Sequence, residues 1–185
     1  MGDPQPIDPS ILPRYAPQRP FPPYRHALGV TPHPRTDPAG HSYGLPEPAP
    51  GPPLTIDGWA VNECYLFGVD LYNHGYVWES HEQWELLWRG AGRQSRPALF
   101  LRGLIQVSAT RLKLNQGNER GVSQLFGRSY SNLMAAVDGS GQPYMGVSIE
   151  AFVASLQEFI EAAPSRRATS VVVEAPTIQL VLPAA

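Results

Sequence analysis

The sequence predicts an all-α protein, a bundle of about five helices with an extended segment at each end. Residues 54–163 contain successive amphipathic stretches of helical period joined by short turns. By contrast, 16 of the 21 prolines lie in residues 1–53, where they exclude regular helix or sheet. A chain of 185 residues is long enough for one domain with a hydrophobic core. We therefore expect a proline-rich arm over residues 1–53, a helical bundle over 54–163 and an apolar tail over 164–185.

The arm is richer in aromatic residues than a disordered tail usually is. We expect its part from Leu12 to Tyr43 to lie against the bundle by inserting rings, and the alternative is a disordered tail. Its aromatic and basic residues are Tyr15, Phe21, Tyr24 and Tyr43, and Arg14, Arg19, Arg25 and Arg35.

The first two helices are predicted from apolar periodicity and from the turn between them. A helical period begins at Thr55 and continues to about Tyr72, with Asp57 as its N-cap. The sequence Asn-His-Gly over residues 73–75 favours a tight turn. The second helix is expected from about Tyr76 to Gly90.

The remaining three helices are predicted from caps and apolar faces. Ser95 and Pro97 begin the third helix, and Gly117 follows its last periodic residue. Asn118 caps a fourth helix that continues to about Val137, and a fifth extends from Ser148 to about Ala162. Past Pro164 the tail is rich in β-branched residues, including Val171–Val173. We expect the tail to lie over the bundle, to pair with the arm or to form a subunit contact in a homo-oligomer.

Composition excludes several functional classes. The net charge is −2 and no segment is strongly basic, so we expect no nucleic-acid partner. Cys64 is the single cysteine, which excludes an internal disulfide and favours the cytoplasm. No apolar stretch is long enough to span a membrane, so we expect no membrane partner.

The second predicted helix carries the candidate site. Trp78, His81, Glu82, Glu85 and Trp88 form one stripe, which we expect to face a cavity inside the bundle. His81 and Glu85 are one turn apart, so an imidazole nitrogen and a carboxylate oxygen can reach one ion. Glu82 is a third candidate ligand or a base. This donor set suits zinc, manganese or iron.

Further ligands would have to come from other segments. The candidates are His33 and His41 in the arm, and Asp70 and His74 near the end of the first helix.

The residues around this stripe resemble those of a known family. His81 to Trp88 fits H-x-x-x-E-x-x-W, and Tyr-Asn-x-Gly-x-x-Trp-Glu precedes it over residues 72–79. Leu-Ile-Gln follows over residues 104–106, in the helix that begins near Pro97. Together these motifs resemble the bacterial and archaeal family called domain of unknown function 309, over about residues 59–137. The resemblance implies a small all-helical fold and a metal role for the His/Glu motif, without an established activity.

Three interpretations of the stripe stay open, namely a metal site, a metal-free ligand or catalytic pocket, and a structural network. In the structural network His81 pairs with Glu85, and Glu85 pairs with Arg102 or Arg111 of the third helix. Such a protein would be a scaffold or interaction protein. No catalytic residue is assigned, and whether the protein is an enzyme is left open. The residues expected around the ligands are Trp78, Trp88, Gln106, Arg102 and Asn73.

Two charged residues of the same helix are expected to act locally. Glu79 lies near the start of the helix and Arg89 near its end, where each charge interacts favourably with the helix dipole and stabilises the helix.

Overall fold

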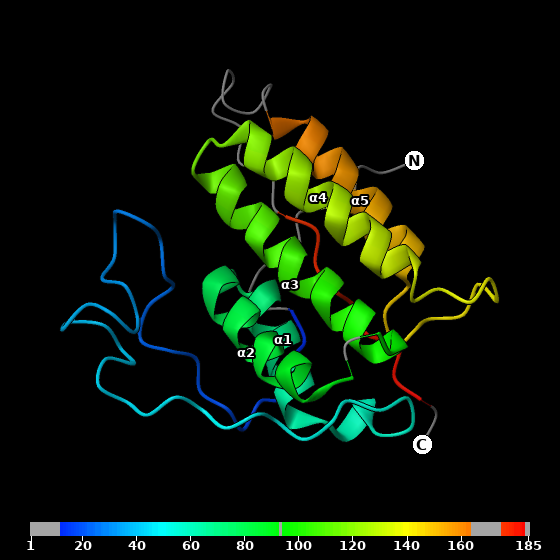
Figure 1. The fold of residues 1–185 in the computed structure, drawn as a ribbon, viewed down its shortest axis with the longest axis horizontal. Coiled ribbons are helices and arrows are strands. Elements are labelled where there is room, and N and C mark those ends of the chain that lie inside the picture. Colours follow the sequence, from blue (N-terminus) through cyan, green and yellow to red (C-terminus); the bar gives the residue numbers. More distant parts are fainter. Residues whose placement is uncertain (1–11, 93, 164–174, 184–185) are drawn as a thin grey trace.

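The structure is a computed structural model that describes residues 12–92, 94–163 and 175–183. It contains five α-helices and one 3₁₀-helix, and the described ranges contain no β-strand, which confirms the predicted all-α class. Figure 1 shows the five helices as one bundle with α3 in the middle. The elements are η1 (Trp59–Val61), α1 (Glu63–Asn73), α2 (Val77–Gly90), α3 (Arg96–Asn115), α4 (Glu119–Met134) and α5 (Ile149–Glu161).

The first predicted helix begins later than the sequence suggested. The chain forms the short helix η1 and then α1, whose N-cap is Asn62 rather than Asp57. The Asn62 side chain accepts a hydrogen bond from the Tyr65 amide at 3.0 Å while its own backbone is extended. An asparagine side chain that accepts from a free backbone amide is a strong N-cap. It starts α1 at Glu63, so the helix predicted from Thr55 does not form as one continuous helix.

The starts of α3 and α4 agree with their predicted caps, whereas α4 ends at Met134, before the expected Val137, and Ser148 makes no side-chain cap at α5. The Ser95 hydroxyl accepts from the Ala98 amide at 3.3 Å, and the Asn118 side chain accepts from the Gly121 amide at 2.8 Å. Gly75 and Gly117 have φ of 80° and 69°, a conformation that glycine adopts at low cost after a helix. Short turns at these positions place consecutive helices side by side.

The core lies where the five α-helices meet. Leu101 and Leu104 of α3 and Trp84 of α2 are fully buried in it. α1 and α2 approach closely because Gly68 has no side chain, and a Cβ atom at Gly68 would lie 2.2 Å from Nε1 of Trp84. This packing fixes the orientation of α2, the helix that carries the candidate site.

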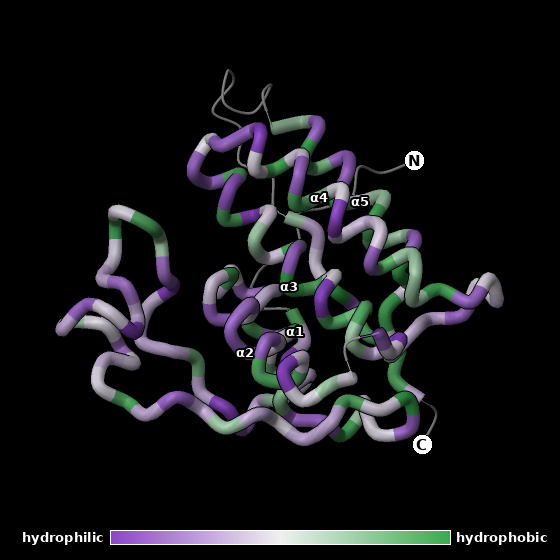
Figure 2. Tube along the Cα trace, viewed as in Figure 1, coloured by the Kyte–Doolittle hydropathy of each residue, from purple (hydrophilic) through white to green (hydrophobic). Residues whose placement is uncertain are grey.

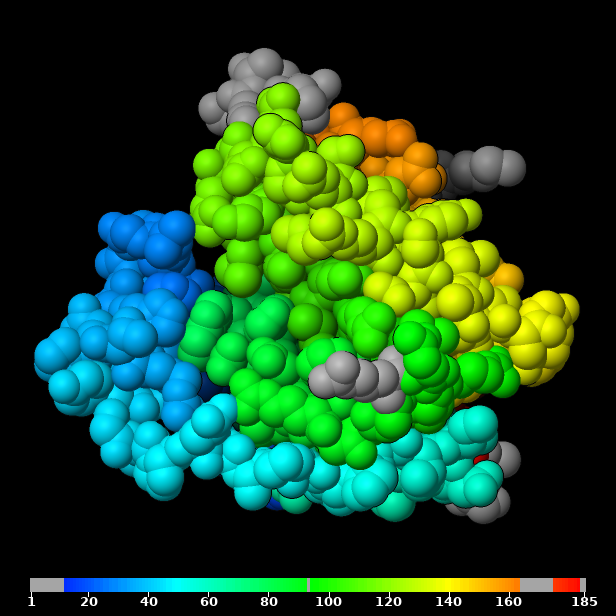
Figure 3. All heavy atoms as spheres, in the orientation of Figure 1, coloured from blue at the N-terminus to red at the C-terminus, as the bar shows by residue number. Residues whose placement is uncertain are grey.

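The described part of the arm, residues 12–53, contains no helix or strand and lies along α1 and α2. Figure 3 shows it as blue and cyan atoms that form a lobe beside the bundle and a band beneath it. Figure 2 shows hydrophobic and hydrophilic stretches along this segment, and the apolar side chains of Leu28, Val30 and Leu45 are exposed.

Asp70 of α1 holds the start of the arm. Its carboxylate is fully buried and accepts from Nε of Arg14 at 2.9 Å and from the amides of Tyr15 and Ala16 at 2.8 and 2.9 Å. Three donors around one buried carboxylate are strong, charge-assisted contacts.

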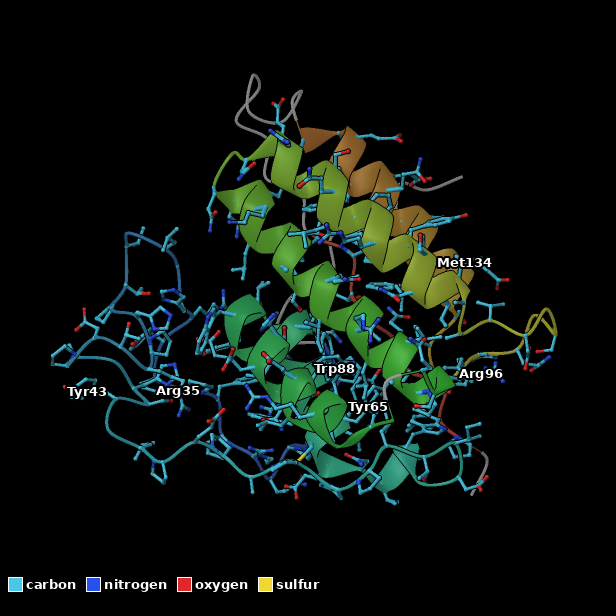
Figure 4. All side chains as sticks on the ribbon, viewed as in Figure 1. Arg35, Tyr43, Tyr65, Trp88, Arg96 and Met134 are labelled. Carbon is cyan, nitrogen blue, oxygen red and sulfur yellow. The ribbon has the colours of Figure 1, made fainter. Side chains whose placement is uncertain are left out.

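The predicted ring insertion holds for part of the arm. Tyr15 and Phe21 pack against the core. Tyr24 is used inside the arm, where its hydroxyl donates to the Pro32 carbonyl at 3.0 Å and accepts from the His41 amide at 3.2 Å. The prediction for Tyr43 is wrong, because its side chain is 50% exposed at the outer end of the lobe (Figure 4).

The described part of the tail, residues 175–183, lies on the bundle and touches the arm. Ile178 is 1% exposed, and its backbone exchanges two hydrogen bonds with the Asn73 side chain at 2.7 and 2.8 Å. The Leu180 amide donates to the Tyr15 hydroxyl at 2.9 Å. Val171–Val173 lie outside the described residues. None of the helices in the described ranges is long and apolar enough to cross a membrane.

Candidate functional site

The polar stripe of α2 lies at the edge of the helix rather than in its core-facing side. Ser80, Trp84 and Leu87 are fully buried and face the bundle. The side chains of His81 and Glu85 are 26% and 29% exposed. The stripe is therefore half-buried, and the expectation that it faces an internal cavity is wrong, because Trp84 fills the inward position.

His81, Glu82 and Glu85 nevertheless come together. One ligand atom from each of the three side chains lies within 4.8 Å of the other two. His81 Nδ1 is 3.5 Å from Oε1 of Glu82 and 3.8 Å from Oε2 of Glu85. In the part of the chain that the structure describes, no other group of three or more histidine, cysteine or acidic side chains is close enough to hold an ion.

The carboxylate of Glu82 is held in its ionised form. A hydrogen bond from His81 lowers the pKa of Glu82, and the positive charges of Arg35 and Arg89 lower it further, against an opposing effect of burial. Glu85 has a competing partner, because Nη2 of Arg89 is 3.2 Å from its Oε1. Arg89 also pairs with Glu47 of the arm. Arg89 is thus more than a helix-end charge, since it connects α2 to the arm.

The two tryptophans of the stripe, which we expect around the ligands, contact residues of the arm and of α3. The ring of Trp78 is 5.7 Å from that of His26 and 5.3 Å from that of His33. Trp88 lies under the guanidinium of Arg102 at 5.4 Å, and its buried Nε1 has no hydrogen-bond partner among the described residues.

Two residues expected near the ligands are engaged elsewhere. The amide oxygen of Gln106 accepts from Asn132 of α4 at 2.8 Å, because this side of α3 faces α4. Asn73 holds the tail at Ile178. Arg111 donates to the Tyr72 carbonyl at 3.1 Å.

The additional ligands considered for the site lie in other contacts. Asp70 binds the arm, and the His74 ring lies tilted against the Phe21 ring, with 4.9 Å between the ring centres. His33 packs against His26 at 5.1 Å, and His41 approaches Glu79. The three grouped ligands therefore all come from α2.

Glu79 is the residue whose role the sequence did not reveal. We interpreted it as a helix-end charge, but its side chain is only 5% exposed. Its Oε1 accepts from the His26 amide at 2.9 Å and lies 3.4 Å from Nε2 of His41, while its buried Oε2 has no partner among the described residues. The sequence does show several histidines in the arm and several acidic residues on α2, which could have suggested a contact. Nothing in the sequence indicates that these two segments meet.

A cavity of about 350 Å³ lies between the arm and α2. Glu79 and Glu82 both line it, so it adjoins the group formed by His81, Glu82 and Glu85. Phe21 of the arm and Phe67 of α1 contribute apolar walls, and Arg35 contributes a positive charge. Figure 4 shows Arg35 on the arm lobe, on the side nearer to the helices than Tyr43.

One family model matches the part of the chain that contains α2. Curated proteins gave no match to the chain. The family described as "Domain of unknown function (DUF309)" matches residues 65–125, which extend from α1 through α2 and α3 into α4. The matched residues include His81, Glu82 and Glu85. The match supports the resemblance over these residues, which make up less than half of the chain.

Proposed function

We propose that this protein binds one divalent transition-metal ion through His81, Glu82 and Glu85. The observation that supports this most is that their three ligand atoms converge at one edge of α2. Ligands bound to zinc at about 2.0–2.1 Å lie about 3.3 Å apart in a tetrahedral site. The separations of 3.5 and 3.8 Å around His81 are close to that value.

The chemistry of the donors selects the class of metal. One imidazole and two carboxylates favour manganese, iron or zinc over calcium and magnesium, which prefer oxygen ligands alone. The Arg89 contact with Glu85 would have to be exchanged for the ion. Three protein ligands leave coordination positions for water or another ligand, as in open metal sites.

The contacts of the cluster favour this function over the structural alternative. A polar residue that fixes the register of a helix has to contact a second helix. Ser80 does this, because its hydroxyl lies 2.9 Å from the hydroxyl of Ser108 on α3 inside the core. The three ligands instead contact one another and Arg89 on their own helix. Their half-exposed position supports binding of a ligand from solvent.

Titration calorimetry with Mn²⁺ and Zn²⁺ on metal-free protein tests the proposal. We expect one ion per chain, and we expect His81→Gln and Glu85→Gln each to weaken binding by about tenfold or more, because a direct ligand is lost. The matched control is Glu158→Gln, since Glu158 is exposed on α5 away from the site. Binding that is unchanged in both site variants, or no binding to the wild-type chain, would contradict the proposal.

Two expectations from composition extend this proposal. We place the protein in the cytoplasm because its single cysteine, Cys64, is free. We also expect no nucleic-acid partner, since the net charge is −2. Assembly into a homo-oligomer is a further expectation, which size-exclusion chromatography with light scattering would test.

A further inference from the structure

The cavity between the arm and α2 has the composition of a ligand site that does not depend on a metal. Its volume of about 350 Å³ is at the small end of the range for ligand pockets. Phe21, Phe67 and Trp78 supply apolar walls, and charged side chains of both signs lie among them. The lining thus combines these apolar walls with three arginines and three glutamates, and convergent polar groups in a concave site with apolar walls are typical of small-molecule binding.

Glu79 gives the cavity an acceptor that the protein leaves unused. Its side chain is 5% exposed, and its Oε2 is buried without a hydrogen-bond partner in the described part of the chain. Its other oxygen already accepts from the His26 amide. Leaving a buried carboxylate oxygen unsatisfied is costly, so a donor from outside the chain is expected there.

Arg35 gives the cavity a cation for which the described residues offer no hydrogen-bond acceptor, although its charge acts on Glu82. Its guanidinium lines the cavity, and within the described ranges no carboxylate or carbonyl oxygen lies within hydrogen-bond distance of it. The other two arginines of the cavity are already in contact with the protein. Arg89 pairs with Glu47 and Glu85, and the guanidinium of Arg19 lies 4.1 Å from the centre of the Phe67 ring.

We propose that this cavity binds a small zwitterion, whose amino group donates to Glu79 and whose anionic group accepts from Arg35. The carbon chain between the two ends lies against Phe21 and Trp78. Neither Glu79 nor Arg35 belongs to the metal group, but Glu82 of that group also lines the cavity, so the two sites are tested separately by keeping this test free of metal. The anionic end is a carboxylate or a phosphonate-like group, since a guanidinium binds both.

Calorimetry with probes of matched length tests this proposal on the full chain in a chelating buffer. The zwitterions are ω-amino acids of three to six carbons, and the controls are the alkylamines and alkanoates of the same lengths. We expect at least one zwitterion to bind about tenfold or more tightly than its matched amine and alkanoate, because it alone makes both charged contacts. Aminoalkyl phosphonates of the same lengths then show which anionic group is preferred.

Two substitutions assign the ends of the ligand. Glu79→Gln keeps a carbonyl oxygen for the His26 amide but replaces the unused acceptor with a donor, and Arg35→Gln removes the cation. Each substitution should lower the affinity for the zwitterion by about tenfold. The affinity for the matched amine should fall in Glu79→Gln and stay unchanged in Arg35→Gln, because the amine makes no contact with Arg35. The control variants are Glu158→Gln on α5 and Arg128→Gln on α4, both exposed and remote.

Three results would overturn the proposal. The zwitterions could show no binding at concentrations up to about 10 mM, a rough upper limit for the dissociation constant of a specific site. Water would then be the partner of Glu79. The zwitterions could bind no more tightly than the amines, or bind equally to wild type, Glu79→Gln and Arg35→Gln. Each of these leaves the metal titration unaffected, and a failed metal titration leaves this test valid. Far-ultraviolet circular dichroism of each variant ensures that a loss of binding is not a loss of fold.

Discussion

Two buried carboxylates, Asp70 and Glu79, each accept hydrogen bonds from the arm. Asp70 accepts three hydrogen bonds from Arg14, Tyr15 and Ala16. Glu79 accepts one from the His26 amide and keeps one oxygen without a partner among the described residues. Buried charges are tolerated when they are paired, so the satisfied carboxylate is structural and the half-satisfied one is the better candidate for binding.

His74 makes stability depend on pH. Burial lowers the pKa of His74 from its usual value near 6.5, and the charges of Arg14 and Arg25 lower it further, although Asp70 opposes them. The unfolded chain therefore takes up a proton at His74 first as the pH falls, and the free energy of unfolding decreases below about pH 6.5. We expect urea denaturation at pH 7.5 and 5.5 to show a larger loss of stability in the wild type than in His74→Gln.

The other histidines are present in both proteins, so their contribution cancels in this comparison. An equal or steeper loss of stability in His74→Gln between the two pH values would contradict the assignment to His74.

At the scale of single residues, the sequence revealed contacts within one helix and missed contacts between distant segments. His81, Glu82 and Glu85 could be predicted to meet because helical geometry alone brings residues four apart to one face. Glu79 meets His26, 53 residues away, and Gln106 meets Asn132 rather than the α2 ligands. Such partners depend on the path of the chain, which local periodicity does not contain.

At the scale of elements, the arm behaves as part of the fold. Arg14 and Tyr15 are tied to α1 through Asp70, and Tyr15 in turn accepts from Leu180 of the tail. Phe21 stacks on Tyr76 at 4.8 Å. The arm therefore links the bundle to the tail and covers α1 and α2.

Asp70→Asn should release this part of the arm. The asparagine keeps one acceptor but puts an amide donor where Arg14 and Ala16 donate, which leaves buried donors unsatisfied. We expect the free energy of unfolding to fall by about 2–4 kcal/mol, as when a buried ion pair loses one partner. Limited proteolysis with trypsin should then cleave after Arg14 and Arg25 faster than in the wild type.

The matched control is Asp57→Asn, because Asp57 is exposed ahead of η1. That change should alter stability by less than about 0.5 kcal/mol. Cleavage of Asp70→Asn at the wild-type rate, with unchanged stability, would show that the arm is held by other contacts.

The helices themselves were predictable from their caps. Ser95 and Asn118 cap α3 and α4 through their own side chains, which is a local property. Asp57 and Asn62 are both acceptable caps, and the sequence did not decide between them. Asn62 is the cap in the structure, and Val61 just before it is left 84% exposed.

At the scale of the whole molecule, the arm and the site occupy one side of the bundle. Figure 1 shows the arm beside α2, while α4 and α5 lie on the other side of α3. The cavity and the group of His81, Glu82 and Glu85 share Glu82, so a bound ion and a bound small molecule would be neighbours. The all-helical class followed from periodicity, but this shared location required the three-dimensional path of the arm.

Anomalous diffraction from crystals grown with Mn²⁺ tests the metal site most directly. We predict one anomalous peak per chain, within about 2.0–2.3 Å of Nδ1 of His81 and of one oxygen each from Glu82 and Glu85, with Arg89 displaced from Glu85. The account would be contradicted by a peak at another position. It would also be contradicted by the absence of a peak while Arg89 stays in contact with Glu85.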